Sequence, residues 1–372
     1  MSNHKTPFIY KLIDMPWFFI SMTSLISCIG FIALYSAAQG SIDPWASRQM
    51  VRFAIAVPLM IIIALIDIRF WFHFAYFGYA LGLILLFLVD IIGTTGMGAQ
   101  RWLSFAGFNF QPSELMKVFL IIALARYFQL LHWSAADRVI SLIIPGILIA
   151  VSAFLVLRQP NLGTASIMVM ASAILFFLGG VSWKKFAIAG IAFLALLPVV
   201  WNHMHDYQRQ RVHTFLNPES DPLGAGYNII QSKIAIGSGG FFGKGFLKGT
   251  QSQLSFVPEK QTDFIFSILA EEYGFVGSVG ILILYAMLIT AGMKIALQCE
   301  SLFGKLVSFG ITIVLFLHVF INMGMVSGIL PVVGVPLPLL SYGGSSMIST
   351  LIGFGFIVNA YVYRNTQIET EF

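Results

Sequence analysis

The sequence contains very little charge. Only 10% of its 372 residues are Asp, Glu, Lys or Arg, whereas 58% are hydrophobic and the mean hydropathy is +0.86. A water-soluble domain of this composition could not cover its surface with polar groups. The shortage of charge therefore excludes a soluble globular protein and predicts an integral membrane protein.

Cysteine is also scarce, and the two that occur cannot meet. Cys28 lies inside the first apolar run and Cys299 in a short polar connection, which excludes a disulfide between them and a thiolate metal site. Basic and aromatic residues do not interleave outside the apolar runs, so we expect no nucleic acid as a partner. The run GSGGFFGKG lacks a preceding strand and a GKS or GKT ending, which argues against a nucleotide-binding loop.

Long apolar runs are abundant instead. Each is long enough to cross the ~30 Å of a bilayer's hydrocarbon as a helix. The ten runs cover residues 17–36, 51–67, 71–91, 114–131, 139–157, 162–180, 186–201, 264–297, 303–326 and 342–362. They predict an all-α polytopic membrane protein in which one domain, residues 1–372, has ten transmembrane helices. Spans one to seven lie within 17–203, spans eight to ten lie within 263–363, and a large loop, 204–262, joins the two sets.

The distribution of basic residues in the short connections predicts the orientation. With the N-terminus inside, ten basic residues face the cytoplasm and five face outward. The inside set is Lys5, Lys11, Arg69, Arg126, Arg138, Lys184, Lys185, Lys294, Lys305 and Arg364, and the outside set is Arg48, Arg52, Arg101, Lys117 and Arg158. We therefore expect residues 1–16 and 364–372 in the cytoplasm and the large loop on the extracytoplasmic face.

The stretch GILPVVGVPLPLLSYGG, residues 328–344, cannot be a continuous helix because it contains three prolines and several glycines. Broken backbone at membrane depth is tolerated only where it is buried in protein or lines a wet cavity. In the span before it, Asn322 needs a hydrogen-bond partner. Ser341 and Tyr342 follow the broken stretch among small residues, for which close helix packing is the default explanation.

The large loop ends at Asp263, at the start of an apolar run. On helical spacing Asp263, Ser267 and Glu271 would share one face turned into the bundle. At ~1.5 Å per residue the two carboxylates would be about 12 Å apart along the axis, too far to act as a paired acid and base. Two interpretations stay open: Asp263 is a single catalytic carboxylate, or it is the N-cap of a helix.

Two other outward-facing clusters contain candidate residues. In QPSELMK, Glu114 and Lys117 are spaced to form an ion pair on one helix face; alternatively Lys117, together with Arg101, contacts an anionic headgroup. In RQPNLGT, Gln159 and Asn161 suit helix capping, whereas Arg158 suits a phosphate.

Within the large loop, Arg209 and Arg211 suit snorkelling towards lipid phosphates. Residues 227–236 have helical spacing of apolar residues, with Gln231 and Lys233 on other faces. An amphipathic helix on the membrane surface is therefore expected there.

Six of these stretches together resemble the SEDS family (shape, elongation, division and sporulation), and the loop resembles its RodA branch more than its division branch. They are QPSELMK, RQPNLGT, YQRQR, DPLGAGYNIIQSKIAIGSGG, PEKQTDFIFSILAEE and LPVVGVPLPLLSYGGSS, in this order along the chain. The resemblance extends from the first span to the last. It implies a peptidoglycan glycosyltransferase with ten spans in the bacterial cytoplasmic (inner) membrane, with its active site on the extracytoplasmic face.

The resemblance also implies a reaction and site residues. Lipid II would be polymerised as an acceptor 4-hydroxyl attacks a donor glycan linked to undecaprenyl pyrophosphate, and Asp263 matches the family's essential aspartate. A positioned carboxylate that removes the hydroxyl proton supplies general-base catalysis, typically ~10² to 10⁴-fold. The predicted substrate-binding residues are Arg101, Glu114, Lys117, Arg158, Gln159, Arg209, Arg211, Gln231, Lys233, Ser341 and Tyr342.

Further expectations concern the cofactor and partners. The leaving pyrophosphate needs charge stabilisation, from basic side chains or from a divalent cation, Mg²⁺ or Mn²⁺, that the sequence does not specify. A class B penicillin-binding protein transpeptidase and other elongation-complex membrane proteins are the implied partners. Asn161 stands where relatives usually have Asp, which puts any metal or proton role at that position in doubt. A lipid II flippase and a scaffold for the transpeptidase are the alternative functions.

Overall fold

The computed structural model describes residues 8–96, 99–105, 108–131, 137–203, 209, 213–215, 217, 225–250 and 259–368. Its helices are α1 (Phe8–Ile13), α2 (Trp17–Ala37), α3 (Trp45–Leu65), α4 (Ile68–Ile92), α5 (Pro112–Leu130), η2 (Val139–Leu142), α6 (Ile143–Arg158), α7 (Leu162–Leu178), α8 (Trp183–His203), α10 (Ala225–Ser238), α12 (Ile265–Gln298), α13 (Leu302–Val326) and α14 (Gly344–Val362). Its strands are β1 (Thr94–Gly96), β2 (Ala99–Phe105) and β3 (Phe108–Phe110).

A helix overlaps each of the ten predicted apolar runs. Among the described residues, seven helices are long and apolar enough to cross a membrane: α2, α3, α4, η2 with α6, α12, α13 and α14. The chain is thus a helical multi-pass membrane protein, and α7 is apolar but shorter. The expectation of helix at 227–236 is confirmed by α10.

The prediction of an all-α chain is wrong between α4 and α5. There β1, β2 and β3 form an antiparallel sheet in that order, with Leu103 opposite Phe110 and Thr95 opposite Gln100. Strands of three to seven residues are too short for a periodic pattern to reveal them. Pairing satisfies backbone groups of this connection that would otherwise need water.

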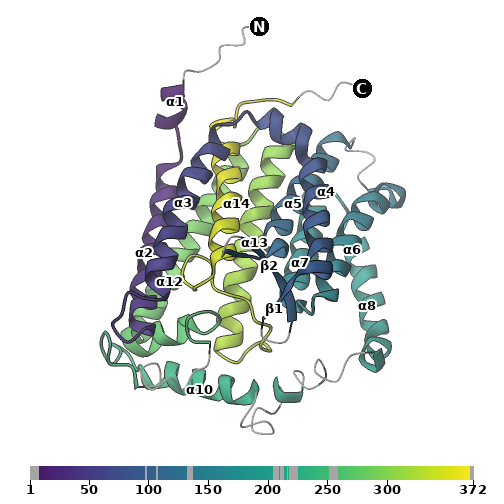
Figure 1. Cartoon of the computed structure of the whole chain (residues 1–372). Helices are drawn as coiled ribbons and strands as arrows, with labels where there is room; N and C mark the ends of the chain where they lie inside the picture. Colours follow the sequence, from purple (N-terminus) through teal and green to yellow (C-terminus); the bar gives the residue numbers. More distant parts are fainter. Residues whose placement is uncertain are drawn as a thin grey trace.

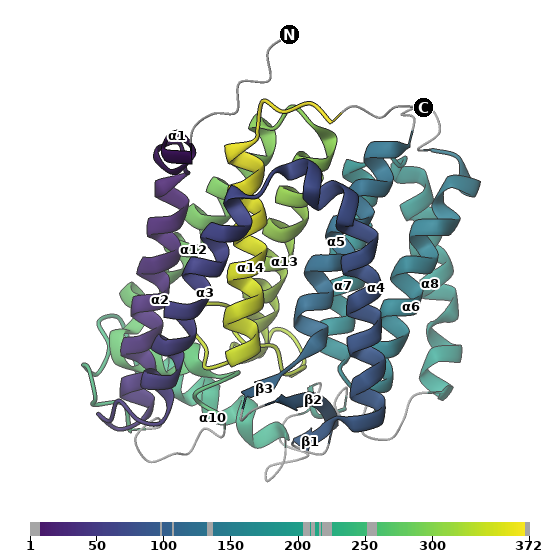
Figure 2. The ribbon, with the colours of Figure 1, turned by 45° about the horizontal axis from the view of Figure 1, so that its top comes forward.

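The helices form one bundle with a buried centre (Figure 1). α13 and α14 are the most enclosed, since 72% of the apolar window in each is buried, against 22% in α12. α14 packs along α3, and α13 contacts α5, α7 and α12. Both chain ends lie at one end of the bundle, whereas α10 and the sheet lie at the other (Figure 2). We call the latter the sheet end.

α12 is broken at Gly274, where φ is +67° and ψ is −157°. A break of this kind leaves backbone groups without helical partners. Residues 239–245 supply them: the Lys244 amide donates to the Glu271 carbonyl (3.0 Å), and the Phe275 amide donates to the Gly240 carbonyl (2.9 Å). The break therefore depends on close contact between two backbone segments.

Substitution of Gly274 by Ala tests this contact. A Cβ at position 274 would lie 2.3 Å from the Gly243 nitrogen and would occupy a left-handed conformation, which costs about 1–3 kcal/mol before the clash is counted. We expect G274A to lower the midpoint of thermal unfolding in detergent clearly. The matched control is G280A on the same helix, where a Cβ has no atom within 4 Å; equal midpoints for the two variants would contradict this description of the break.

Candidate functional site

A polar cavity of about 290 Å³ lies at the sheet end of the bundle. It is enclosed by β2, by the first turns of α5, α7 and α14, and by two irregular segments. These segments are residues 259–264, before α12, and residues 327–343, after α13. Its lining residues are Arg101, Trp102, Gln111, Glu114, Asn161, Thr164, Glu259, Thr262, Asp263, Gly334, Pro336, Tyr342, Gly343 and Ser346. The lining thus contains three carboxylates and one arginine.

Asp263 lies in a turn before α12. The helix begins at Ile265 and its N-cap is Phe264, so the N-cap interpretation of Asp263 is wrong, and Asp263 lies before the helix on which its shared face with Glu271 was predicted. The turn is closed by the Thr262 amide, which donates to the Glu259 carbonyl at 3.0 Å. A Cβ at Gly334, across the cavity, would lie 3.5 Å from Asp263 Oδ2, so the backbone of the 327–343 segment approaches the carboxylate closely.

Asn322 holds the two irregular segments together. Its Nδ2 donates to the Asp263 carbonyl at 2.8 Å and to the Val335 carbonyl at 2.7 Å, from inside α13. The expectation that this intramembrane amide needs a partner is confirmed. Its two bonds fix the backbone at Asp263 against the opposite wall of the cavity.

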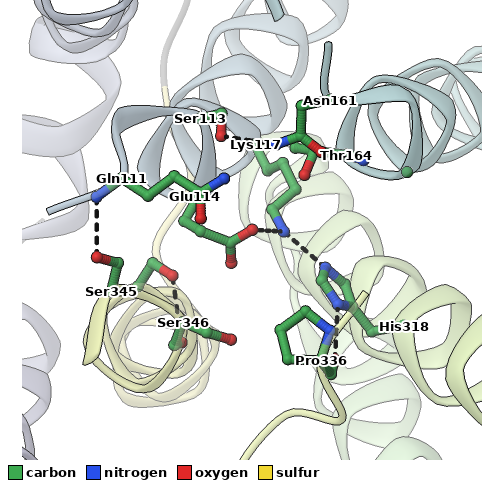
Figure 3. Close-up of polar contacts among 12 residues, drawn as sticks. Gln111, Ser113, Glu114, Lys117, Asn161, Thr164, His318, Pro336, Ser345 and Ser346 are labelled. Carbon is green, nitrogen blue, oxygen red and sulfur yellow. Dashed lines mark hydrogen bonds and ion pairs between the residues drawn. The ribbon is translucent and has the colours of Figure 1, made fainter. Parts of the chain in front are cut away.

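The predicted ion pair between Glu114 and Lys117 is confirmed, with Lys117 Nζ 2.8 Å from Glu114 Oε1. Lys117 Nζ also lies 2.6 Å from Nε2 of the His318 ring. The other ring nitrogen, Nδ1, is 3.4 Å from the Pro336 carbonyl (Figure 3). Because an ammonium group only donates, Nε2 accepts and the proton is assigned to Nδ1. All three side chains are buried. The charge of Glu114, which lines the cavity, is therefore balanced by Lys117 on the side away from the cavity.

Arg101 and Asn161 line the cavity, whereas Arg158 and Gln159 do not. Arg101 lines the cavity and donates to the carbonyls of Gln159 (3.0 Å for Nε) and Pro160. Asn161 also lines it and caps α7 by accepting from the Thr164 amide at 3.3 Å. Gln159 points elsewhere and donates to the Leu86 carbonyl at 3.0 Å. Arg158 is 56% exposed and lies 3.6 Å from Asp90, outside the cavity lining.

Tyr342 lines the cavity, and its ring contacts the guanidinium of Arg52, which was not predicted to be part of the site. The Arg52 guanidinium lies 4.8 Å from the Tyr342 ring centre, and Arg52 Nη1 is buried with no hydrogen-bond partner in the described ranges. Gln49, one turn earlier on α3, donates to the Ser341 carbonyl at 3.0 Å. Ser341 itself is buried and accepts from the Leu337 amide at 2.8 Å.

The remaining predicted binding residues lie away from the cavity. Gln231 and Lys233 are on α10, and neither lines it. Arg209 donates to the Asn202 carbonyl at 2.8 Å, whereas Arg211 is outside the described residues. The structure thus brings Arg101, Glu114, Asp263 and Tyr342 together, with Lys117 and Ser341 directly behind them. Proximity to the cavity does not test a role, so the catalytic role of Asp263 and the binding roles of all the other residues stay predictions.

Three residues of the site were missed by the sequence reasoning: Arg52, Glu259 and His318. His318 could have been found, because an ionisable residue inside a span is a functional candidate by default. Glu259 stood inside the PEKQTDF motif but was not considered apart from Asp263. Burial of Lys260, its neighbour, lowers the pKa of that amino group below its ordinary value.

The described side chains of the site do not form a complete metal centre. Within the described ranges, no group of three or more His, Cys, Asp or Glu side chains could hold a metal ion. One of the cavity carboxylates, Glu114, is already paired with Lys117. These side chains do not fit a cation held by the protein alone, so the divalent cation stays a prediction and no chemical step is derived through it.

Fold and cavity together define a polytopic helical membrane protein with a carboxylate-containing polar site at one end of its bundle. The sequence profile of the FtsW/RodA/SpoVE family, described as cell cycle proteins, matches residues 15–366. The chain belongs to this family, and the resemblance to SEDS proteins is confirmed.

Two relatives show how far the similarity extends. The peptidoglycan glycosyltransferase MrdB of Escherichia coli strain K12 is 45% identical over 341 residues, which cover 90% of this chain and 91% of MrdB. The stage V sporulation protein E of Bacillus subtilis strain 168 is 36% identical over 358 residues, covering 92% and 96% of the two chains.

Solved structures share the fold. The rod shape determining protein RodA of Thermus thermophilus matches with a TM-score of 0.71 at 30% identity, over 95% of this chain and 98% of RodA. A chain from a peptidoglycan synthase complex, described as coordinating polymerization and crosslinking, matches with a TM-score of 0.82 at 36% identity, over 94% and 98%.

The buried ion pair behind the cavity generates a prediction about stability. Replacing Lys117 by Met leaves the Glu114 carboxylate buried and unpaired, which costs about 3–5 kcal/mol of unfolding free energy. The double variant K117M/E114Q removes the uncompensated charge, so we expect it to recover most of the loss. Unfolding in detergent measures both.

A control variant is available at a more exposed ion pair. Lys185 and Asp137 lie 2.6 Å apart with side chains that are 25% and 54% exposed, so K185M should change the unfolding midpoint little. If K117M is as mild as K185M, the Glu114–Lys117 pair is not the buried pair that the structure shows.

Proposed function

We propose that the chain is a peptidoglycan glycosyltransferase that polymerises lipid II into β-1,4 glycan strands during cell elongation and maintenance of rod shape. The observation that carries this proposal is the placement of Asp263 in a polar cavity at the sheet end, beside Arg101 and Glu114. Similarity to MrdB, a peptidoglycan glycosyltransferase, over nine-tenths of the chain supports the reaction class.

Asp263 is the general base in this proposal. A sugar hydroxyl is a poor nucleophile at neutral pH, and a carboxylate within hydrogen-bond reach takes its proton as the new bond forms. The acceptor's 4-hydroxyl attacks the anomeric carbon of the donor, the bond to undecaprenyl pyrophosphate breaks, and the proton moves to Asp263. Direct attack on an α-linked donor inverts the configuration to β.

The leaving pyrophosphate needs positive charge but no proton. Among the residues that the structure describes, Arg101 is the one Lys or Arg side chain in the cavity lining, and Arg52 lies behind Tyr342 with a buried Nη1 that makes no hydrogen bond to any of them. Lys117 is committed to Glu114 and His318, so its contribution is to balance the charge of Glu114. A Mg²⁺ or Mn²⁺ ion on the pyrophosphate would add charge from the substrate side.

The topology that suits this reaction has ten spans, with the shorter or more polar helices α5, α7 and α8 also crossing the bilayer. Both termini are then cytoplasmic, and the sheet end with residues 204–262 faces outward in the bacterial inner membrane. The excess of basic residues in the connections at the terminus end supports this orientation. The whole chain, residues 1–372, is one membrane domain.

The proposed partner is a class B penicillin-binding protein transpeptidase, together with other elongation-complex membrane proteins. Support comes from the similarity to a chain of a peptidoglycan synthase complex that coordinates polymerization and crosslinking. Polymerisation by this chain would supply the strands that the partner crosslinks. Lipid II flipping and a pure scaffolding role are the competing functions that the first experiment below separates.

Substitution of Asp263 by Asn tests the proposed base. The amide keeps the shape of the carboxylate but cannot accept the proton, so polymer formation from labelled lipid II should fall by ~10² to 10⁴-fold. The control is D67N: Asp67 caps α4 by accepting from the Arg69 amide at 2.8 Å, far from the cavity, and its variant should polymerise normally.

Two results would count against this proposal. Equal polymer from wild type and from D263N of normal abundance would remove Asp263 from the mechanism. Transfer of lipid II across a bilayer by wild type, with no polymer formed, would instead favour the flippase.

A pair of buried asparagines tests whether the backbone at Asp263 must be held in place. Asn322 bonds the Asp263 carbonyl, whereas Asn359 donates to the carbonyls of Ile63, Ala64 and Ile66 (3.1, 3.1 and 2.6 Å) at the terminus end. Loss of either amide should lower the unfolding free energy by about 1–3 kcal/mol. We expect N322A to lose polymerase activity per folded molecule and N359A to keep it; the same activity in both would refute a positioning role for Asn322.

A further inference from the structure

An aromatic tip protrudes from the loop that fills the break in α12. Phe241 and Phe242 are 59% and 80% exposed, and the adjoining Phe275 is 59% exposed. The Phe241 ring stacks on Phe275 with centroids 5.7 Å apart and meets Phe242 at 4.9 Å. We call these three residues the aromatic tip. Clustered exposed aromatic side chains of this kind mark a surface that contacts something apolar.

The tip is held rigidly. Besides the backbone bonds around Gly274, Lys244 forms a 2.8 Å ion pair with the fully buried Glu271, and Thr250 donates to the same carboxylate at 3.2 Å. On the other side, the Leu247 amide donates to Glu272 Oε1 at 3.2 Å. The aromatic rings are therefore presented outward by a fixed scaffold.

The depth of the tip follows from the length of α12. After the break, the helix runs from Phe275 to Gln298, which is about 24 residues or ~36 Å. Since ~30 Å of hydrocarbon must be crossed, Phe275 lies near the outer boundary of the bilayer. The same loop also reaches the outer end of α2, where Phe246 stacks on Tyr35 at 6.2 Å. The tip is thus level with the outer ends of two spans.

The surface of the tip continues onto an exposed apolar side of α12. Val276, Leu282 and Ile283 follow Phe275 along the helix and are 50%, 45% and 52% exposed. A protein partner would need no such continuity, whereas an apolar leaflet would cover the tip and the helix side together.

We propose that the aromatic tip inserts into the outer leaflet of the membrane, at the boundary between headgroups and acyl chains. Aromatic and other large apolar side chains beside a span are stabilised at this level. The chemistry of the partner is that of a phospholipid bilayer.

A second consequence rests on the proposed function. Glu271 and Glu272 connect the tip's scaffold to the first segment of α12, which begins two residues after Asp263. A tip fixed at the leaflet boundary therefore fixes the depth of Asp263 relative to lipid headgroups, where a lipid-linked donor carries its pyrophosphate.

Photocrosslinking tests the insertion independently of any activity. The full-length protein with benzoylphenylalanine in place of Phe242 is reconstituted in vesicles of phosphatidylethanolamine and phosphatidylglycerol that contain a radiolabelled phospholipid. Ile283, on the exposed side of α12, is the positive control position, and Lys248, exposed in the same loop, is the negative one. We expect labelling by lipid from position 242 to match position 283 and to exceed position 248 several-fold.

Two outcomes would overturn the insertion. One is lipid labelling from position 242 that is no higher than from 248. The other is crosslinking to a co-reconstituted transpeptidase in place of lipid, which would assign the tip to a protein interface.

The effect of the aromatic tip on the depth of Asp263 is tested by comparing activity in detergent and in vesicles. The double variant F241S/F242S should polymerise lipid II as wild type does in detergent but several-fold more slowly in vesicles. Equal loss of activity by F241S/F242S in both media would refute the idea that the tip fixes the depth of Asp263. If wild type polymerises lipid II in neither medium, the proposed function is contradicted, while the crosslinking result is unaffected.

Discussion

Hydrocarbon cannot solvate a backbone amide, a carbonyl or a charged side chain, and the architecture of this protein follows from that constraint. Two irregular segments, the turn before α12 and residues 327–343, line the cavity where a soluble enzyme would rely on water. Each is held by side chains from neighbouring helices: Asn322 bonds both segments, Gln49 bonds the Ser341 carbonyl, and the Tyr285 hydroxyl donates to the Pro338 carbonyl. Without these partners the wall around Asp263 could not exist at membrane depth.

The same constraint separates charges that are available for chemistry from charges that are already compensated. Lys117 is buried between Glu114 and His318, so it balances the cavity instead of opening onto it. Lys244 similarly pairs with Glu271 and holds a loop in place. Arg101, by contrast, lines the cavity while its bonds to backbone carbonyls orient it. A basic residue at the sheet end is therefore a candidate substrate ligand only where its pairing leaves it open to the cavity.

Much of the fold could be predicted from the sequence, because length and apolarity are enough to mark a helix in a membrane. The prolines and glycines of 328–344 correctly predicted broken backbone, and Asn322 correctly demanded a partner. The sheet was missed because its strands are short. Helical spacing could not be applied from Asp263 to Glu271, because Asp263 lies in the turn at 259–264 before α12 begins. Arg52 escaped notice because its place in the site comes from Tyr342, a neighbour that is distant in the chain, whereas His318 was overlooked although its position inside a span made it a candidate.

In the proposed reaction, Asp263 accepts the proton of an acceptor hydroxyl in this cavity. The most direct measurement is a cryo-electron microscopy structure of the D263N protein, with its partner, trapped with lipid II in both the donor and acceptor positions. We expect an acceptor 4-hydroxyl within about 2.6–3.2 Å of the side chain at position 263, with the pyrophosphate beside Arg101. Sugars bound elsewhere, with no hydroxyl in reach of position 263, would contradict it.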